Sequence, residues 1–120
     1  MAYIINLPTF NDERGSLTVA EQSIPFEIKR VFYIYNIQGK RGGHGHKKAI
    51  NALICLHGSC KVNIKNDKEE SSIILNEPNQ CLILNPIDWH TMDNCSENAL
   101  LLVLSSEPYC KDDYVFEAPS

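Results

Sequence analysis

Two histidines, His44 and His46, lie in a short basic and glycine-rich stretch between two apolar, β-branched runs. Residues 40–48 read Lys-Arg-Gly-Gly-His-Gly-His-Lys-Lys, so four cations and three glycines surround the pair. Alternate side chains of a strand point the same way, so both imidazoles leave one face of a sheet if the strand already holds at His44. Gly45 between them lets a ligand or a backbone come close. The stretch suits proton chemistry on an anionic substrate.

Two chemical uses fit this His-x-His pair, and a structural one stays open beside them. Histidine titrates near neutral pH, so it can act as general base and general acid. Metal-binding β-barrels add a Glu and a later His; His90 is present, but no Asp or Glu occurs between His46 and Asp67. The adjacent lysines also repel a cation. We therefore expect no metal, and spacing alone leaves acid–base catalysis and a solvated or structural pair as alternatives.

Length and composition bound the class of protein. The 120 residues are 43% hydrophobic and 22% charged, which predicts one domain over residues 1–120. A net charge of −4 argues against a nucleic-acid partner, although residues 29–48 carry six cations and no acid. No run approaches the ~18 apolar residues of a membrane span. Residues 1–8 lack the basic region and apolar core of a signal peptide.

The cysteine pattern points to a reducing compartment. An odd count without a Cys-x-x-Cys pair argues against a disulfide framework and against a four-thiolate zinc site. We expect small buried hydrophobic side chains in the cytoplasm. The five residues are Cys55, Cys60, Cys81, Cys95 and Cys110.

The elements that must position the histidines read as short strands. Turn residues separate the β-prone runs, and no sustained helical period is present, which predicts an all-β sandwich or jelly-roll barrel. Residues 60–65 alternate cleanly, with Val62 and Ile64 on one face. Residues 38–43 are expected to form a basic loop. The predicted runs are 3–7, 16–20, 28–37, 49–56, 60–65, 72–75, 81–84, 99–104 and 109–116.

Five longer motifs carry a family resemblance. They are Asp-Glu-Arg-Gly-Ser-Leu at 12–17, Ile-Pro-Phe-Glu-Ile-Lys-Arg-Val-Phe-Tyr at 24–33, Arg-Gly-Gly-His-Gly-His-Lys at 41–47, Trp89, and Asp-Tyr-Val at 113–115. The chain resembles, nearly end to end, the sugar-nucleotide 3,4-ketoisomerases, which are cupins related to the deoxysugar 3,5-epimerases. It departs from that family at Gly45, where Ala is usual, at Phe32, where Tyr is usual, and in a shorter loop before Arg41. The resemblance implies a cupin, a jelly-roll β-barrel.

The resemblance also implies an activity. Its members move the keto group of a dTDP-linked 4-keto-6-deoxyhexose from C4 to C3 through an enediol, on the way to a 3-amino-3,6-dideoxyhexose of bacterial surface glycans such as lipopolysaccharide or S-layer glycan. It puts His46 in the role of proton shuttle, with His44 moving protons between the two oxygens or polarising them. Tyr33 would bind the hexose or a histidine. No cofactor is implied.

Binding residues follow from the same resemblance and from side-chain chemistry. Arg14, Arg41 and Lys47 are candidates for the diphosphate, since guanidinium groups pair with phosphate oxygens bidentately. Trp89 is a candidate to stack on the base or the sugar. Each has a structural alternative, a solvated surface charge or a core aromatic. We expect His90 to be structural, and the resemblance implies a homodimer.

Three other functions stay open at this point. A dTDP-sugar 3,5-epimerase uses a His–Asp dyad with a Tyr acid, and the sequence shows no evident Asp partner for a histidine. A non-catalytic nucleotide-sugar-binding cupin would bind without hydrogen exchange. A metal-dependent dioxygenase would need a metal that the residues near His46 do not favour. The sequence does not fix galacto or gluco stereochemistry at C4 of the product.

Overall fold

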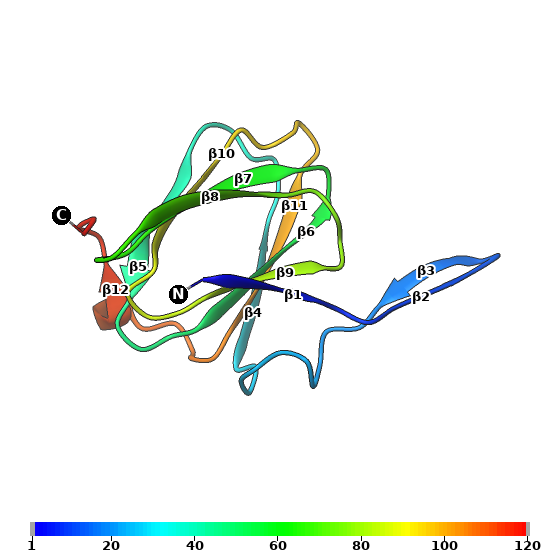
Figure 1. The fold of residues 1–120 in the computed structure, drawn as a ribbon, viewed down its shortest axis with the longest axis horizontal. Helices are drawn as coiled ribbons and strands as arrows, with labels where there is room; N and C mark the ends of the chain where they lie inside the picture. The colour runs from blue at the N-terminus through cyan, green and yellow to red at the C-terminus, as the bar shows by residue number, and fades with distance from the viewer. Residues whose placement is uncertain (1, 120) are drawn as a thin grey trace.

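The computed structural model describes residues 2–119, and its strands form two facing sheets with a separate hairpin (Figure 1). The first sheet has the order β1 (Tyr3–Asn6), β9 (Gln80–Leu84), β6 (Asn51–His57), β11 (Leu100–Ser105) and β4 (Arg30–Ile34). The second has the order β12 (Tyr114–Val115), β5 (Arg41–His46), β10 (Trp89–Asp93), β7 (Cys60–Lys65) and β8 (Glu70–Leu75). The hairpin joins β2 (Thr9–Asp12) to β3 (Gly15–Thr18). This architecture confirms the predicted all-β jelly-roll barrel.

The single helical element in the described part of the chain is η1 (Lys111–Asp113), one 3-10 turn before β12. No helix among residues 2–119 is therefore long and apolar enough to cross a membrane.

The main core fills the space between the two sheets. The predicted alternation in β7 is confirmed, because Cys60, Val62 and Ile64 are buried while the residues between them are half-buried. In the first sheet, the register aligns Phe32, Val103 and Leu53 across β4, β11 and β6 on the inner face. Apolar side chains from both sheets thus form one core between them, and part of that core also borders the cavity described below.

A second core covers the outer face of the first sheet. It is built on β6, β9 and β11 by Ala52, Ile54, Cys81, Ile83 and Leu104. Leu7 and Ile24, from the segments that flank the hairpin, pack over these side chains. The central strands of the first sheet are therefore buried on both faces, which explains their near-continuous apolar sequences.

Two parts of the second sheet differ from the sequence-based expectation. Strand β10 was not among the predicted runs, since Trp-His-Thr-Met-Asp lacks a β-branched alternation, yet it pairs with both β5 and β7. Residues 41–43 belong to β5 rather than to a loop. Gly42 and Gly43 have φ of 85° and 80°, and the β5–β10 register shifts beside them, as at a β-bulge.

Gly42 is needed at this bulge for a second reason. A Cβ atom there would lie 2.9 Å from the carbonyl oxygen of His90. At Gly45 a Cβ atom would lie 3.4 Å from the carbonyl oxygen of Asp88, which is ordinary contact. Backbone does approach Gly45 as predicted, and the alanine usual in the resembled family would fit there.

The expectation for the cysteines was wrong for one pair. Cys60 and Cys95 form a disulfide that joins the start of β7 to the loop after β10. The pairing of β7 with β10 brings these residues together across 35 positions of sequence, so no local Cys spacing signals it. Cys110 is exposed, whereas Cys55 and Cys81 are buried as predicted. Burial raises the pKa of the Cys81 thiol to about 12, so it stays protonated.

Candidate active site

Cross-strand pairing in the second sheet gathers four rings at one place. His90 of β10 lies opposite His44 of β5, and Tyr114 of β12 lies opposite His46. Opposite residues on one face of a sheet are neighbours. The ring centroids lie 4.9 Å apart for His44 and His90, 4.6 Å for His46 and Tyr114, and 5.3 Å for His44 and His46. The two imidazoles of the His-x-His pair therefore share one face, as predicted.

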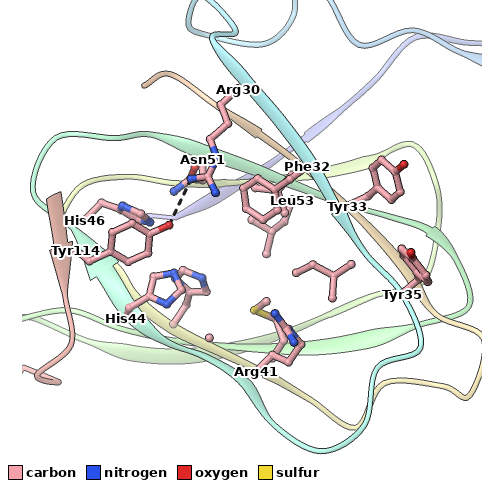
Figure 2. Close-up of a pocket in the computed structure, with 15 residues that line it drawn as sticks. Arg30, Phe32, Tyr33, Tyr35, Arg41, His44, His46, Asn51, Leu53 and Tyr114 are labelled. Atoms are coloured by element: carbon pink, nitrogen blue, oxygen red, sulfur yellow. Dashed lines mark hydrogen bonds between the residues drawn. The ribbon is translucent and has the colours of Figure 1, made fainter. Parts of the chain in front are cut away.

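These rings line one end of a cavity of about 440 Å³ between the two sheets (Figure 2). That volume is within the range of small-molecule sites. The first sheet contributes the facing wall, and Arg41 of β5 also lines the cavity. The wall residues from the first sheet include Arg30, Phe32, Ile34, Asn51, Leu53 and Val103.

Asp113, the last residue of η1, holds the ring of His46. Its Oδ2 atom lies 3.0 Å from Nδ1 of His46, and its two oxygens also accept the backbone N–H groups of Lys48 and Ala49 at 2.7 and 3.3 Å. Burial alone would raise the pKa of Asp113, but these hydrogen bonds hold that pKa below its ordinary value. A carboxylate at Nδ1 fixes the imidazole tautomer and leaves Nε2 as the nitrogen available for proton transfer.

Burial keeps the histidines neutral near pH 7. Burial lowers the pKa of His46; the hydrogen bond that the His46 ring donates to the Asp113 carboxylate opposes that change, and the positive charge of Arg30 adds to the lowering. Burial, then the neighbouring His46, lowers the pKa of His44. Burial lowers the pKa of His90 to about 3, with His44 and His46 adding to the effect. A neutral His46 held by a carboxylate can accept a proton and return it.

His90 was expected to be structural, and the structure shows that it also faces the cavity. It is buried, and its Nδ1 atom has no hydrogen-bond partner within residues 2–119. Although three histidines share this region, no group of three or more His, Cys, Asp or Glu side chains in the described part of the chain is arranged to hold a metal ion. The arrangement supports acid–base chemistry.

Three residues of the site were not predicted from the sequence. The Asp–His dyad, described above as without an evident Asp, is present: Asp113 pairs with His46 across 67 positions. Tyr114 follows it, and both belong to the Asp-Tyr-Val motif, which was the available signal. Arg30 lies in the motif at 24–33 and is directed into the cavity because β4 alternates.

Tyr33 is placed differently from the histidines. It lies opposite Leu102 on the outer face of the first sheet, is 62% exposed, and stacks on Tyr35 with a centroid distance of 6.0 Å. Figure 2 shows both tyrosines at the far end of the cavity from His44 and His46. Among the described residues, Tyr33 makes no recorded hydrogen bond or ring contact with a histidine.

Three predicted binding residues lie outside the cavity. Trp89 faces the outer side of β10, opposite Lys65 of β7, and its indole N–H donates to the carbonyl oxygen of Phe116 at 3.3 Å. Lys47 is exposed beside η1. Arg14 lies in the turn of the β2–β3 hairpin, where its guanidinium is 2.7 Å from Asp12 and its side chain is 87% exposed. That hairpin projects from the opposite side of the barrel to β12 (Figure 1).

Comparison with known proteins places this chain in a family. The family model described as "FdtA: WxcM-like, C-terminal" matches residues 1–119. The TDP-4-oxo-6-deoxy-alpha-D-glucose-3,4-oxoisomerase of Aneurinibacillus thermoaerophilus is 40% identical over 116 residues, which are 93% of this chain and 84% of that protein.

Solved structures agree with this assignment. A 3,4-ketoisomerase from Helicobacter canadensis is 41% identical with a TM-score of 0.92, over 97% of this chain and 90% of that one. QdtA, a sugar 3,4-ketoisomerase from Thermoanaerobacterium thermosaccharolyticum solved with TDP, is 41% identical with a TM-score of 0.93, over 97% and 88%. The epimerase RmlC from Legionella pneumophila shares the fold alone, at 16% identity and a TM-score of 0.78 over 94% and 70%. The match along nearly the whole chain shows that this protein belongs to the FdtA (WxcM-like, C-terminal) family.

Proposed function

We propose that the protein is a 3,4-ketoisomerase acting on a TDP-linked 4-keto-6-deoxyhexose. The observation that carries this proposal is the His46–Asp113 dyad on the wall of a cavity of small-molecule size. Relatives at about 40% identity are named for this reaction, and a QdtA variant has been solved with TDP-4-keto-6-deoxyglucose. The reaction needs a base that reaches two neighbouring ring carbons, and a fixed imidazole supplies one.

Each proton transfer of the reaction can be assigned to one of these residues. The C4 ketone acidifies the hydrogen at C3, and Nε2 of His46 removes it to give an enediol intermediate. The resulting imidazolium is stabilised by the carboxylate of Asp113 and returns the proton at C4. His44, whose ring centroid lies 5.3 Å from that of His46, would move a proton between the two oxygens. The product is a 3-keto sugar, suited to amination on the way to a 3-amino-3,6-dideoxyhexose of a surface glycan.

Substrate binding is proposed for residues at the other end of the cavity. Arg41 lines the cavity and is the candidate for the diphosphate. Tyr33 and Tyr35 form an exposed aromatic pair at the rim, where a sugar or a base can stack. Trp89 and Lys47 would bind only a part of the substrate that extends over the outer surface.

Arg14 lies away from the histidine cavity of its own chain and would contact such a cavity only in a second copy of the chain. The β2–β3 hairpin that carries it projects from the barrel (Figure 1) and leaves Phe10 and Leu17 63% and 60% exposed. Exposed apolar side chains on a projecting hairpin are typical of an interface. We therefore infer a homodimer in which the hairpin packs on the partner, and sedimentation of the native chain against a Phe10→Asp, Leu17→Asp variant tests it.

A second candidate, the 3,5-epimerase, gains support from one finding. The dyad and the adjacent Tyr114 supply the residue types that an epimerase uses. Incubation with TDP-4-keto-6-deoxyglucose in heavy water separates the two reactions by proton NMR. A ketoisomerase gives a 3-keto sugar with deuterium at C4, whereas an epimerase inverts and labels C3 and C5. Tight binding without any exchange would instead indicate a non-catalytic binding protein.

A further inference from the structure

Arg30 places a guanidinium group inside the barrel. Its side chain lies on the inner face of β4, in register with Ser105 and, one strand further, Asn51. It lines the same cavity as the histidines (Figure 2). The guanidinium carbon lies 4.4 Å from the centre of the Phe32 ring, so an aromatic face supports it.

One hydrogen bond fixes this group against the catalytic rings. Nη1 of Arg30 donates to the hydroxyl oxygen of Tyr114 at 3.3 Å. The Tyr114 ring in turn lies 4.6 Å from the ring of His46 and 4.9 Å from that of His44. Since the phenol accepts from Arg30, its own hydrogen stays available to a substrate oxygen.

The charge of Arg30 is not matched by an acid. Among residues 2–119, no carboxylate lies within ion-pair distance of Arg30; the ion pairs in this part of the chain involve Arg14, His46 and Lys48. A partly buried cation without an acidic partner is costly in a folded protein. Its electrostatic effect reaches the catalytic base, because it contributes to the lowered pKa of His46. Such a group favours a ligand that becomes negative at this place.

We propose that Arg30 is a catalytic residue that stabilises the oxyanion formed during isomerisation, with the Tyr114 hydroxyl as its hydrogen-bonded partner. The inference rests on the proposed ketoisomerase function and assigns a charge-stabilising group that the His46–Asp113 dyad does not supply. Preorganised donors aimed at a developing oxyanion contribute strongly to catalysis in a cavity closed to water.

The step balances without any added reagent. When His46 takes the proton from C3, the C–H electron pair forms the C3–C4 double bond and the carbonyl pair moves onto O4. Arg30 and the Tyr114 hydroxyl donate hydrogen bonds to that anionic oxygen. The proton of the O3 hydroxyl passes to O4, the pair left on O3 rebuilds a carbonyl at C3, and C4 takes its proton from His46. The sugar gains and loses no atoms.

The test compares Arg30→Gln with Lys29→Gln, which removes the same charge from the neighbouring exposed position. We expect kcat of Arg30→Gln to fall about 10²-fold or more with KM changed less than about fivefold, and Lys29→Gln to stay within about twofold. Arg30→Lys keeps the charge without the planar fork and should recover at least about tenfold of the loss. Retained TDP binding shows that each variant is folded.

A pH profile separates this role from a structural one. The groups around His46 are Asp113 of η1, Tyr114 of β12, His44 of β5 and Arg30 of β4, with His90 of β10 beyond His44. Removing the Arg30 charge raises the pKa of His46, so the acid limb of kcat/KM should move to higher pH in Arg30→Gln and stay in place in Arg30→Lys.

The outcomes are distinct. A folded Arg30→Gln with kcat within threefold of native, or an Arg30→Lys no better than Arg30→Gln, overturns the role of Arg30 while the native activity stands. If Arg30→Gln does not fold, Arg30→Met replaces it under the same criteria, because methionine keeps an apolar stem of similar length and removes the charge. A native protein that forms no 3-keto sugar overturns the proposed function and this inference together.

Discussion

The inner and outer faces of the same strands carry different residues for different reasons. On β10, His90 points into the barrel and contacts His44, while its neighbour Trp89 points outward and bonds to Phe116. On β4, Phe32 points into the barrel, whereas Tyr33 points outward, is 62% exposed and borders the cavity only at its rim. Adjacent residues in a strand always separate in this way. Whether a residue can take part in the chemistry therefore depends less on its place in a motif than on which face of the strand its side chain occupies.

This contrast between the two faces predicts which substitutions reduce turnover and which reduce stability. Inner-face residues at the histidine end should govern turnover, and Gly42, one of the two positive-φ glycines at the β5 bulge, should affect stability. Outer-face residues away from the rim of the cavity should affect neither turnover nor stability strongly. Four variants, taken from the largest expected effect to the smallest, test that division.

The largest effect is expected for His46→Asn. The amide keeps the size of the side chain but cannot shuttle a proton, so turnover should fall about 10³-fold. Binding of TDP, measured by calorimetry, should stay within about threefold of native because the cavity wall is retained. Normal turnover in this variant would show that another group is the base.

Asp113→Asn is expected to reduce kcat/KM by about 10- to 100-fold, as loss of a residue that orients an imidazole does. The Asp113 hydrogen bond raises the pKa of His46, so its loss lowers that pKa and should move the acid limb of kcat/KM to lower pH. Asp112→Asn, an exposed neighbour in η1, is the matched control and should leave the profile in place. A limb that moves upward would contradict the dyad.

Gly42→Ala tests the bulge in β5 that precedes His44 and His46 and turns both side chains toward the cavity. Alanine is strained at a φ of 85° and its Cβ would lie 2.9 Å from the His90 carbonyl oxygen, so we expect a loss of about 2 kcal/mol. Gly39→Ala has positive φ with nothing within 4 Å and should lose about 1 kcal/mol from strain alone. Urea unfolding measures both, and equal losses would remove the contact with β10 from the argument.

The smallest effect is expected for Trp89→Leu. This side chain lies outside the cavity, so KM for the nucleotide sugar should change less than about threefold, whereas Arg41→Gln should raise KM about tenfold. Initial-rate measurements on both variants settle the comparison. A tenfold KM effect at Trp89 would mean that the substrate does extend over the outer surface, where Trp89 could stack on its base or sugar.

Much of the barrel was predictable because its signals are local. The alternation in residues 60–65 and the continuous apolar run of β11 report burial within a few positions. Strand β10 carries no such pattern, since its side chains serve the cavity on one face and the surface on the other. It forms because β5 and β7 offer it pairing partners on both sides.

The site was predictable only where spacing within one strand decided the geometry. The shared face of His44 and His46 follows from their separation by one residue. The Asp113 partner of His46 and the disulfide of Cys60 join segments 67 and 35 residues apart. Such pairs form only when strands far apart in the sequence pair with one another, and no local sequence pattern encodes that pairing. Arg30 was missed because an arginine in a strand reads as a surface charge until the facing wall is known.

The position of Asp113 and Tyr114 in the chain has a consequence for biosynthesis. Both residues follow the last strand of the first sheet, and both are needed to complete the wall around His46. A nascent chain displays its two histidines long before residues 113 and 114 emerge from the ribosome. His44 and His46 are therefore made before the Asp113 carboxylate that orients the His46 ring, and a chain that ended before η1 would carry both histidines without that carboxylate.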